Sequence, residues 1–125
     1  MAILVQLLAT SMASKGVRGV VIDAGCRDIR KLSEMKYPVW SKTMSAQGAV
    51  KETVGSVNVP IVCAVQHVMP GDIVIGDNDG VVIVPIQQAE QVMKAAGNRI
   101  ARENKTRERL QNGELSVDIY NMRPR

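Results

Sequence analysis

Aromatic residues are almost absent from this 125-residue chain, which has no Phe, one Trp and two Tyr. Hydrophobic residues nevertheless make up 46% of the sequence, so a core must be built from Val, Ile, Leu, Ala and Met. Aliphatic side chains of this kind suit a sheet covered by helices. The length allows one small domain rather than two. We therefore expect a single domain of the α/β class over residues 1–125.

Cysteine and histidine are equally scarce. The only cysteines are Cys26 and Cys63, and His67 is the only histidine. One histidine excludes a multi-histidine metal site within a single chain. Two isolated cysteines without a secretion signal favour free thiols in a reducing compartment over a disulfide. We expect a cytoplasmic protein.

Long apolar runs are also missing. No run approaches the roughly 20 residues that a membrane-spanning helix needs. The opening residues, Met-Ala-Ile-Leu-Val-Gln-Leu-Leu, carry no basic region and no cleavage site, so we expect that they do not form a targeting peptide. We expect no membrane partner.

Positive charge is concentrated near the end of the chain. The net charge is +4, and the residues from Lys94 onward hold eight basic and four acidic side chains. Acidic residues such as Glu103 and Glu108 alternate with the basic ones, and no aromatic residues are interleaved for base stacking. This pattern is typical of a solvated helix face, and nucleic acid is not an expected partner.

Hydrophobic spacing and turn residues predict the order of the elements. Helices are expected at 2–15, 28–36 and 87–112, the last with a kink or division at Gly97. Strands are expected at 18–24, 39–41 and 60–68, and as a hairpin at 72–76 and 80–85. The first strand is continuously apolar, which favours burial on both faces. We expect a loop or a pair of irregular strands at 45–58 and an extended tail at 118–122.

Two polar motifs carry candidate chemistry. Asp77-Asn78-Asp79-Gly80 superficially resembles part of a calcium loop, but the expected flanking strands favour a hairpin turn. The second motif is Arg27-Asp28, which follows the strand 18–24 and a predicted glycine turn at Ala24-Gly25. Ligands of open α/β sheets collect at the carboxyl ends of strands. The alternative is an ordinary helix start, with Asp28 at the positive end of the helix dipole and Arg27 solvated.

Arg27 and Asp28 suit one particular kind of chemistry. A single carboxylate and several waters can hold Mg²⁺, while an arginine holds an anionic substrate. No lysine lies in an apolar run that would depress its pKa for Schiff-base formation. Carboxylates are therefore the candidate ligands for a hard metal ion.

Several segments together resemble the divalent-metal pyruvate aldolases of the 4-hydroxy-4-methyl-2-oxoglutarate / 4-carboxy-4-hydroxy-2-oxoadipate type, a family shared with proteins like the regulator of ribonuclease activity A. These segments are residues 7–10, 15–23, 26–28, 50–53, 57–60, 70–72, 79–85, 107–109 and 118–123. They extend over essentially the whole chain, and their combination is more specific than any one of them.

The resemblance implies a swivelling β/β/α fold, of which this chain lacks the N-terminal part. It implies a homotrimer or homohexamer with active sites between subunits, and residues 87–125 would pack on a neighbouring subunit. It also implies cleavage of a 4-hydroxy-2-oxo acid into pyruvate and a second oxo acid, with oxaloacetate decarboxylation as a related activity. The cofactor would be a divalent cation, Mg²⁺ with Mn²⁺ as the alternative.

The resemblance also assigns roles to individual residues. Asp28 would be the metal ligand, and Arg27 would be the catalytic residue that binds substrate and neutralises the developing oxyanion. The substrate-binding segment Val5, Gln6, Leu7 and Leu8 would cover the substrate with backbone amides at a helix N-terminus. Glu103 is a further candidate, for contact with a neighbouring subunit's metal-bound waters.

This chain departs from the family pattern at two positions. Val5 and Gln6 stand where members of this family usually have a glycine and then an acidic residue. Glycine allows close backbone approach, and an amide cannot act as a general base. Two rival functions therefore stay open: a non-catalytic protein that regulates a ribonuclease, and an inactive truncated relative. In the regulators the residue after the arginine is typically not aspartate, so Asp28 favours the enzyme.

Overall fold

The computed structural model describes residues 2–50 and 54–124, and the chain divides between Pro85 and Ile86 into two compact units. The first unit contains all of the strands, and the second contains a long helix. We describe each unit by itself. Part of the segment 50–53, which carries some of the family resemblance, lies outside the described residues.

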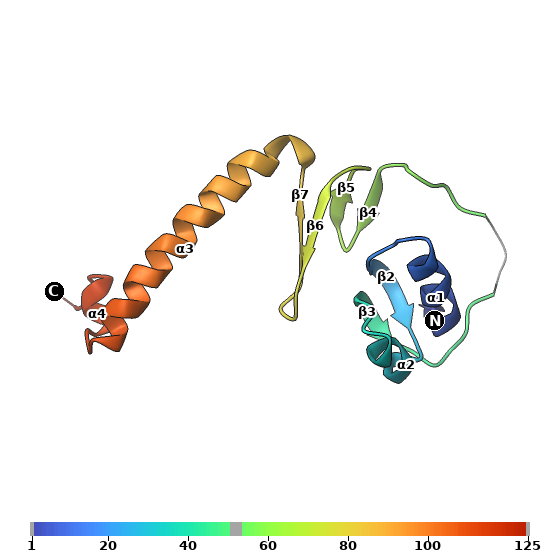
Figure 1. Ribbon diagram of the computed structural model, residues 1–125, viewed down its shortest axis with the longest axis horizontal. Helices are drawn as coiled ribbons and strands as arrows, with labels where there is room; N and C mark the ends of the chain where they lie inside the picture. The colour runs from blue at the N-terminus through green and yellow to red at the C-terminus, as the bar shows by residue number, and fades with distance from the viewer. Residues whose placement is uncertain (1, 51–53, 125) are drawn as a thin grey trace. The chain divides into compact units, whose positions relative to one another are not determined.

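A small parallel sheet forms the first half of the first unit (Figure 1). Its strands stand in the order β1-β2-β3, and α1 and α2 connect them. Because both right-handed crossovers step in the same direction across the sheet, both helices cover the same face, and α1 contacts α2. The elements are β1 (Ala2–Leu4), α1 (Gln6–Ser14), β2 (Val20–Cys26), α2 (Ile29–Glu34) and β3 (Val39–Met44).

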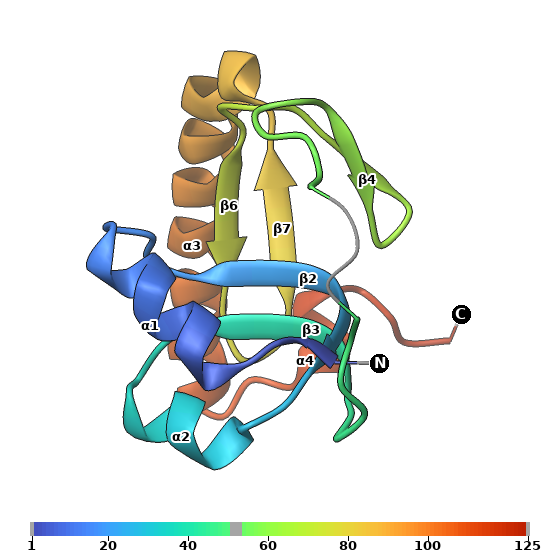
Figure 2. The same cartoon turned by 90° about the vertical axis from the view of Figure 1, so that its right-hand side faces the viewer.

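Two antiparallel hairpins complete the first unit. They pair β4 (Ile61–Cys63) with β5 (Gln66–Val68), and β6 (Ile73–Gly76) with β7 (Val81–Val84), the latter clearly visible in Figure 2. The Asp77 carboxylate accepts the backbone N–H groups of Asp79 and Gly80, at 2.8 and 3.2 Å. This confirms the predicted hairpin turn at residues 77–80, because the carboxylate is occupied by its own backbone.

The second unit is built around α3 (Ala89–Gln111), which follows a short 3-10 turn, η1 (Ile86–Gln88). The helix passes through Gly97 without a break, so the predicted helix is confirmed and the division considered at Gly97 is not present. Gly113 adopts φ +92° just beyond the helix, a left-handed conformation that glycine provides without steric cost.

The buried side chains of the first unit gather mainly beside the parallel sheet. Among the residues whose burial is described, five of the six buried hydrophobic ones belong to β1, α1, β2 and α2. They are Ala2, Leu4, Ala9, Cys26 and Leu32, and the sixth is Val84 on β7. This packing holds the loop after β2 against the start of α1, and it therefore positions the candidate site.

The beginning of the chain differs from the predicted helix 2–15. Residues 2–4 form β1, because Ala2 and Leu4 pair with Gly25 and Cys26 of β2. Only the part from Gln6 onward is helical. The three residues are too few to display a strand period, and pairing with a distant strand decided their conformation.

The predicted turn at Ala24-Gly25 is also wrong. Both residues belong to β2, although the register with β3 shifts between Ile22 and Gly25. Burial of β2 on both faces is not observed either, since Val21 is exposed and the burial alternates over most of the strand. One face of β2 lines a cavity instead of a packed layer.

Two further corrections concern short elements. The predicted strand 60–68 is a hairpin, with a turn at Ala64 and Val65, which both have positive φ. This turn type normally selects Asn or Gly, so its residues gave no turn signal. The expected extended tail at 118–122 instead overlaps a short helix, α4 (Ser116–Ile119).

Candidate functional site

The backbone at Asp28 turns sharply as it leaves the parallel sheet. The Arg27 N–H donates to the Leu4 carbonyl at 3.1 Å, so the chain stays in register with β1 for one residue beyond β2. Asp28 then adopts φ 61° and ψ 33°, directly before α2. Few residues other than glycine occupy this left-handed region, and Asp is one of those that do so most readily. Such conformations persist where surrounding contacts hold them.

The Asp28 carboxylate lies at the N-terminus of α1. Its Oδ2 atom accepts the backbone N–H of Gln6 at 3.3 Å, although the two residues are 22 positions apart. A carboxylate at this end of a helix is favoured by the helix dipole. The neighbouring N–H groups of Leu7 and Leu8 belong to the first turn, where no intrahelical acceptor exists. Amide donors and a carboxylate therefore face the same small region.

Arg27 lies against a loop that the sequence analysis did not include in the site. A Cβ atom built on Gly48 would stand 3.3 Å from the Arg27 Nη1 atom. The loop is held by a hydrogen bond from the Ser45 N–H to the Cys26 carbonyl, at 3.1 Å, and by a bridge between Ala2 and Gly48. Gly48 carries no local sequence signal beyond its place in a polar segment, and only the pairing of distant strands reveals it.

The Gln6 side chain lies along the first turn of its own helix. Its Nε2 atom donates to the Thr10 hydroxyl at 3.3 Å, and that hydroxyl donates to the Gln6 carbonyl at 2.9 Å. The amide can donate and accept hydrogen bonds, but it cannot take up a proton at neutral pH. Residue 6 is therefore placed beside Asp28 without the proton-accepting group that an acidic residue would supply.

Apolar side chains border these polar groups. Leu7 is 76% exposed and Leu8 is 40% exposed, whereas Val5 is partly buried. The structure thus brings the segment Val5–Leu8 close to Arg27-Asp28, through the contacts of Gln6 and Leu4. This proximity is a structural fact, and the roles of these residues remain predictions.

The donor set at Asp28 fits one class of metal ion. Within residues 2–50 and 54–124, no three His, Cys, Asp or Glu side chains come together in a metal-binding group. A closed structural zinc site needs four such ligands. Mg²⁺ instead keeps several waters and binds through one or two carboxylates. One oxygen of Asp28 accepts only a long hydrogen bond from the Gln6 N–H, at 3.3 Å. The carboxylate therefore fits a hydrated Mg²⁺ or Mn²⁺ ion.

Glu103 has an ion-pair partner on its own helix. Glu103 forms an ion pair with Arg99 at 2.8 Å, and the hydrogen bond from that arginine lowers the pKa of the Glu103 carboxyl.

Cys26 and Cys63 are both free thiols, and Cys26 is buried beside the Ser41 hydroxyl at 3.2 Å. Among the helices in the described part of the chain, none is long and apolar enough to cross a membrane.

Comparison with known proteins identifies the family. The model of the RraA-like family, described as Aldolase/RraA, matches residues 1–83. The chain belongs to the RraA-like family. The matched residues include both segments of the candidate site, Val5–Leu8 and Arg27-Asp28.

Individual relatives are similar over most of this chain. An uncharacterised protein of Methanocaldococcus jannaschii is 36% identical over 86% of the chain and 52% of its own length. A protein of Halalkalibacterium halodurans named "Putative 4-hydroxy-4-methyl-2-oxoglutarate aldolase" is 30% identical over 84% of the chain and 50% of its own length. The chain therefore spans about half the length of the curated relatives that it matches.

A solved relative confirms the fold class. The crystal structure of Streptomyces coelicolor RraAS2, described as an unusual member of the RNase ES inhibitor RraA protein family, superimposes with a TM-score of 0.78. Its sequence is 27% identical to this chain, and the match covers 87% of this chain and 56% of that one. The predicted α/β fold of this family is therefore confirmed.

Proposed function

We propose that this chain carries the metal and substrate site of a divalent-metal-dependent pyruvate aldolase. Its substrate would be 4-hydroxy-4-methyl-2-oxoglutarate or 4-carboxy-4-hydroxy-2-oxoadipate, cleaved to pyruvate plus pyruvate or oxaloacetate. The observation that supports this proposal most strongly is the contact between the Asp28 carboxylate and the Gln6 N–H, at 3.3 Å, immediately next to Arg27. The aldolase name of the relative from Halalkalibacterium halodurans is consistent with it.

The reaction breaks a carbon–carbon bond and leaves an electron pair that must be accommodated on an oxygen atom. A bound divalent cation supplies Lewis acidity for this purpose. Asp28 would hold that cation together with water molecules. Arg27 would bind a substrate carboxylate or the developing oxyanion, a preorganised contact whose loss commonly costs a factor of about 10² to 10³ in rate.

The first turn of α1 would contribute to substrate binding through its backbone. The N–H groups of Leu7 and Leu8 are oriented as in other helix N-termini that bind carboxylates. The exposed side chains of these two residues would shield one side of the substrate from water. A branched oxo acid with two or three carboxylates suits a site that combines a cation, a guanidinium and amide donors.

A coupled assay of pyruvate release tests the proposal. We expect turnover with Mg²⁺ or Mn²⁺ and none with EDTA. Asp28→Asn should lower metal-dependent turnover at least about 100-fold, as expected for loss of a direct electrostatic contact. Asp79→Asn makes the same chemical change in the hairpin turn and should leave turnover unaltered. Absence of metal-dependent pyruvate, or equal activity of the two variants, would refute the assignment.

A second candidate function is inhibition of a ribonuclease. The structural similarity to RraAS2 supports it, because that protein is described as a member of an RNase inhibitor family. An RNA-cleavage assay with the purified ribonuclease distinguishes the two functions. Inhibition that persists in EDTA, without pyruvate release, would favour the regulator. Neither activity would favour an inactive relative.

The assembly and location of the protein are part of the same proposal. A homotrimer or homohexamer with sites between subunits, and a cytoplasmic location, would accord with the free thiols and the exposed apolar side chains. The small-molecule partner would be the oxo-acid substrate.

A further inference from the structure

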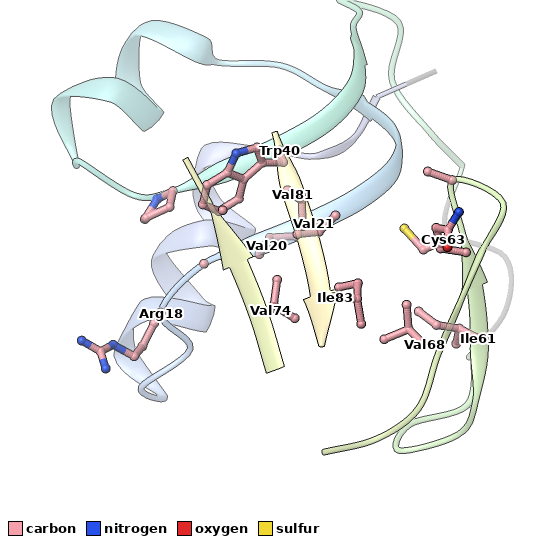
Figure 3. Close-up of a pocket in the computed structure, with 15 residues that line it drawn as sticks. Arg18, Val20, Val21, Trp40, Ile61, Cys63, Val68, Val74, Val81 and Ile83 are labelled. Carbon is pink, nitrogen blue, oxygen red and sulfur yellow. The ribbon is translucent and has the colours of Figure 1, made fainter. Parts of the chain in front are cut away.

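A cavity of the first unit lies apart from Arg27 and Asp28. It has a volume of about 690 Å³ and is bordered by β2, β3 and the two hairpins (Figure 3). The side chains that face it are almost all apolar. They include Val21, Trp40, Cys63, Val68, Val74 and Ile83.

This cavity is open to solvent, so its mostly apolar lining is left in contact with water. An apolar cavity of about 150 Å³ already holds a molecule the size of benzene. The volume here exceeds that several-fold, so it has room for several side chains. Val74 lines the cavity and is 50% exposed, whereas the side chains of a protein interior are normally close-packed.

The strands around the cavity do not close into one sheet. The described residues form one sheet of three strands and two separate sheets of two. A two-stranded hairpin by itself is only marginally stable in water, and each free strand edge presents unpaired N–H and C=O groups. Within the described residues, β3 and each hairpin strand therefore pair on one side only.

A small ligand is a poor occupant of this cavity. Arg18 is the only charged residue of the lining, and in Figure 3 its side chain extends away from the other labelled side chains. Ligand pockets of this size are mostly apolar but contain a small number of precisely placed polar groups that fix orientation, and besides Arg18 the clearly polar side chain of this lining is Gln66. Apolar side chains on strands fit both the lining and the free edges better.

The length of the relatives indicates which polypeptide would supply the apolar strand residues that fill the cavity. The chain keeps the strand arrangement of a solved relative, yet it spans only 56% of that relative. We propose that the cavity binds a polypeptide segment. This segment corresponds to the half of the relatives that this chain does not match. That segment would insert apolar strand residues among β2, β3 and the hairpins and would complete the core.

Binding of this segment can be measured on the full 125-residue chain. The probe is the unmatched half of the Methanocaldococcus jannaschii relative, added as a separate polypeptide. Cys63 lines the cavity, whereas Cys26 is buried elsewhere and serves as an internal reference. We expect a one-to-one complex in which alkylation of Cys63, read by mass spectrometry, slows at least about tenfold because its access to solvent is lost.

Neighbouring residues on β6 supply a matched pair of variants. Val74 lines the cavity and is 50% exposed, while Ile75 does not line it and is 56% exposed. Successive side chains of a strand point to opposite faces. Val74→Glu would bury an unpaired carboxylate in the complex and should weaken binding at least about tenfold, whereas Ile75→Glu should change it less than about threefold.

The two halves of the Methanocaldococcus jannaschii relative, mixed with each other, are the positive control. If they reassociate but the probe does not bind this chain, the proposal is wrong. Equal effects of the two glutamate variants would also overturn it. Protection of Cys63 that rises with the concentration of this chain alone, together with a dimer mass, would show that a second copy fills the cavity. None of these readouts depends on aldolase activity.

Discussion

In the proposed site, residue 6 would determine how a proton can move. Its backbone N–H contacts Asp28, while its side chain is an amide held over the first turn of α1 by Thr10. Retro-aldol cleavage requires the substrate hydroxyl to lose a proton, but decarboxylation of oxaloacetate has no such hydroxyl. An amide at this position should therefore impair the first reaction more than the second.

Replacing this amide by an acid tests that reasoning. Gln6→Glu should raise metal-dependent retro-aldol turnover at least about tenfold, since positioned general bases contribute factors of about 10² to 10⁴. Oxaloacetate decarboxylation should change little. Both rates can be followed by pyruvate release from the two substrates. Gln6→Met has a similar size but cannot carry a proton, so an equal gain with methionine would contradict the prediction.

Gly76 controls how the β6–β7 hairpin meets the parallel sheet. A Cβ atom at this position would stand only 2.5 Å from the Cζ2 atom of Trp40. The indole of Trp40 also donates from Nε1 to the Asp77 carbonyl, at 2.8 Å. The Trp40 ring of β3 therefore packs directly against the backbone of Gly76, and this contact holds the hairpin against β3.

Gly76→Ala should lower the free energy of unfolding by about 2 kcal/mol, because overpacking of this kind costs about 1–3 kcal/mol. Urea unfolding followed by far-ultraviolet circular dichroism measures the change. Gly55→Ala is the control, since no atom lies within 4 Å of its added Cβ. Equal destabilisation by both variants would show that the contact with Trp40 is unimportant.

At the scale of elements, ion pairs stabilise the end of the second unit. Arg109 contacts Glu114 just after α3, and Arg123 pairs with Asp118 of α4. The hydrogen bonds from these arginines lower the pKa of both carboxyls. A lowered folded-state pKa contributes stability above the ordinary carboxyl pKa of about 4, and that contribution is lost as pH falls through the lowered value.

We therefore expect α4 to open as the pH is lowered from 6 to 3. Amide hydrogen exchange at residues 116–119, corrected for the intrinsic pH dependence, should lose protection over this range. Glu114→Gln and Asp118→Asn together should remove most of the response. High salt should weaken the protection at pH 6, because exposed ion pairs are screened. Protection that is constant with pH would contradict the prediction.

At the scale of the whole molecule, α3 presents an apolar stripe that its own unit leaves uncovered. The stripe contains Val92, Met93, Ala96 and Ile100, and no residue of α3 is buried. Ile100 is 59% exposed. A stripe of this spacing normally packs against another element. Packing of residues 87–125 on a neighbouring subunit stays a prediction, and this stripe offers a way to test it.

Ile100→Glu should reduce the proposed trimer or hexamer to smaller species, because it would place a charge in the apolar contact. Sedimentation velocity measures the distribution of masses. Arg102→Gln changes the net charge by the same amount on the opposite side of the helix, and it should leave the assembly intact. If the two variants sediment alike, α3 does not form the interface.

Local signals were sufficient for several elements of the fold. The turn residues Asp77 and Gly80 predicted the β6–β7 hairpin, and the apolar period of residues 87–112 predicted α3. Both patterns act between residues that are close in sequence, so they can be interpreted without the tertiary fold. The turn at Ala64 and Val65 could not be predicted, because these residues adopt positive φ against their own preference.

The candidate site was only partly predictable for the same reason. Arg27 and Asp28 were predicted as site residues because they follow an apolar strand, and the family resemblance indicated residues 5–8. The approach of Gly48 to Arg27 has no counterpart in the local sequence. It depends on the pairing of β1 with β2 and on the path of the loop after β3.

The sequence by itself determined the α/β class, the aliphatic core, the long helix α3 and the charged pair at residues 27 and 28. These properties follow from composition and short-range periodicity. Only the tertiary structure decided that Ala2–Leu4 form a strand, that Asp28 reaches the N–H of Gln6, and that an apolar cavity remains between the strands. Each of these depends on burial and hydrogen bonding between residues far apart in the chain, which local preferences cannot specify.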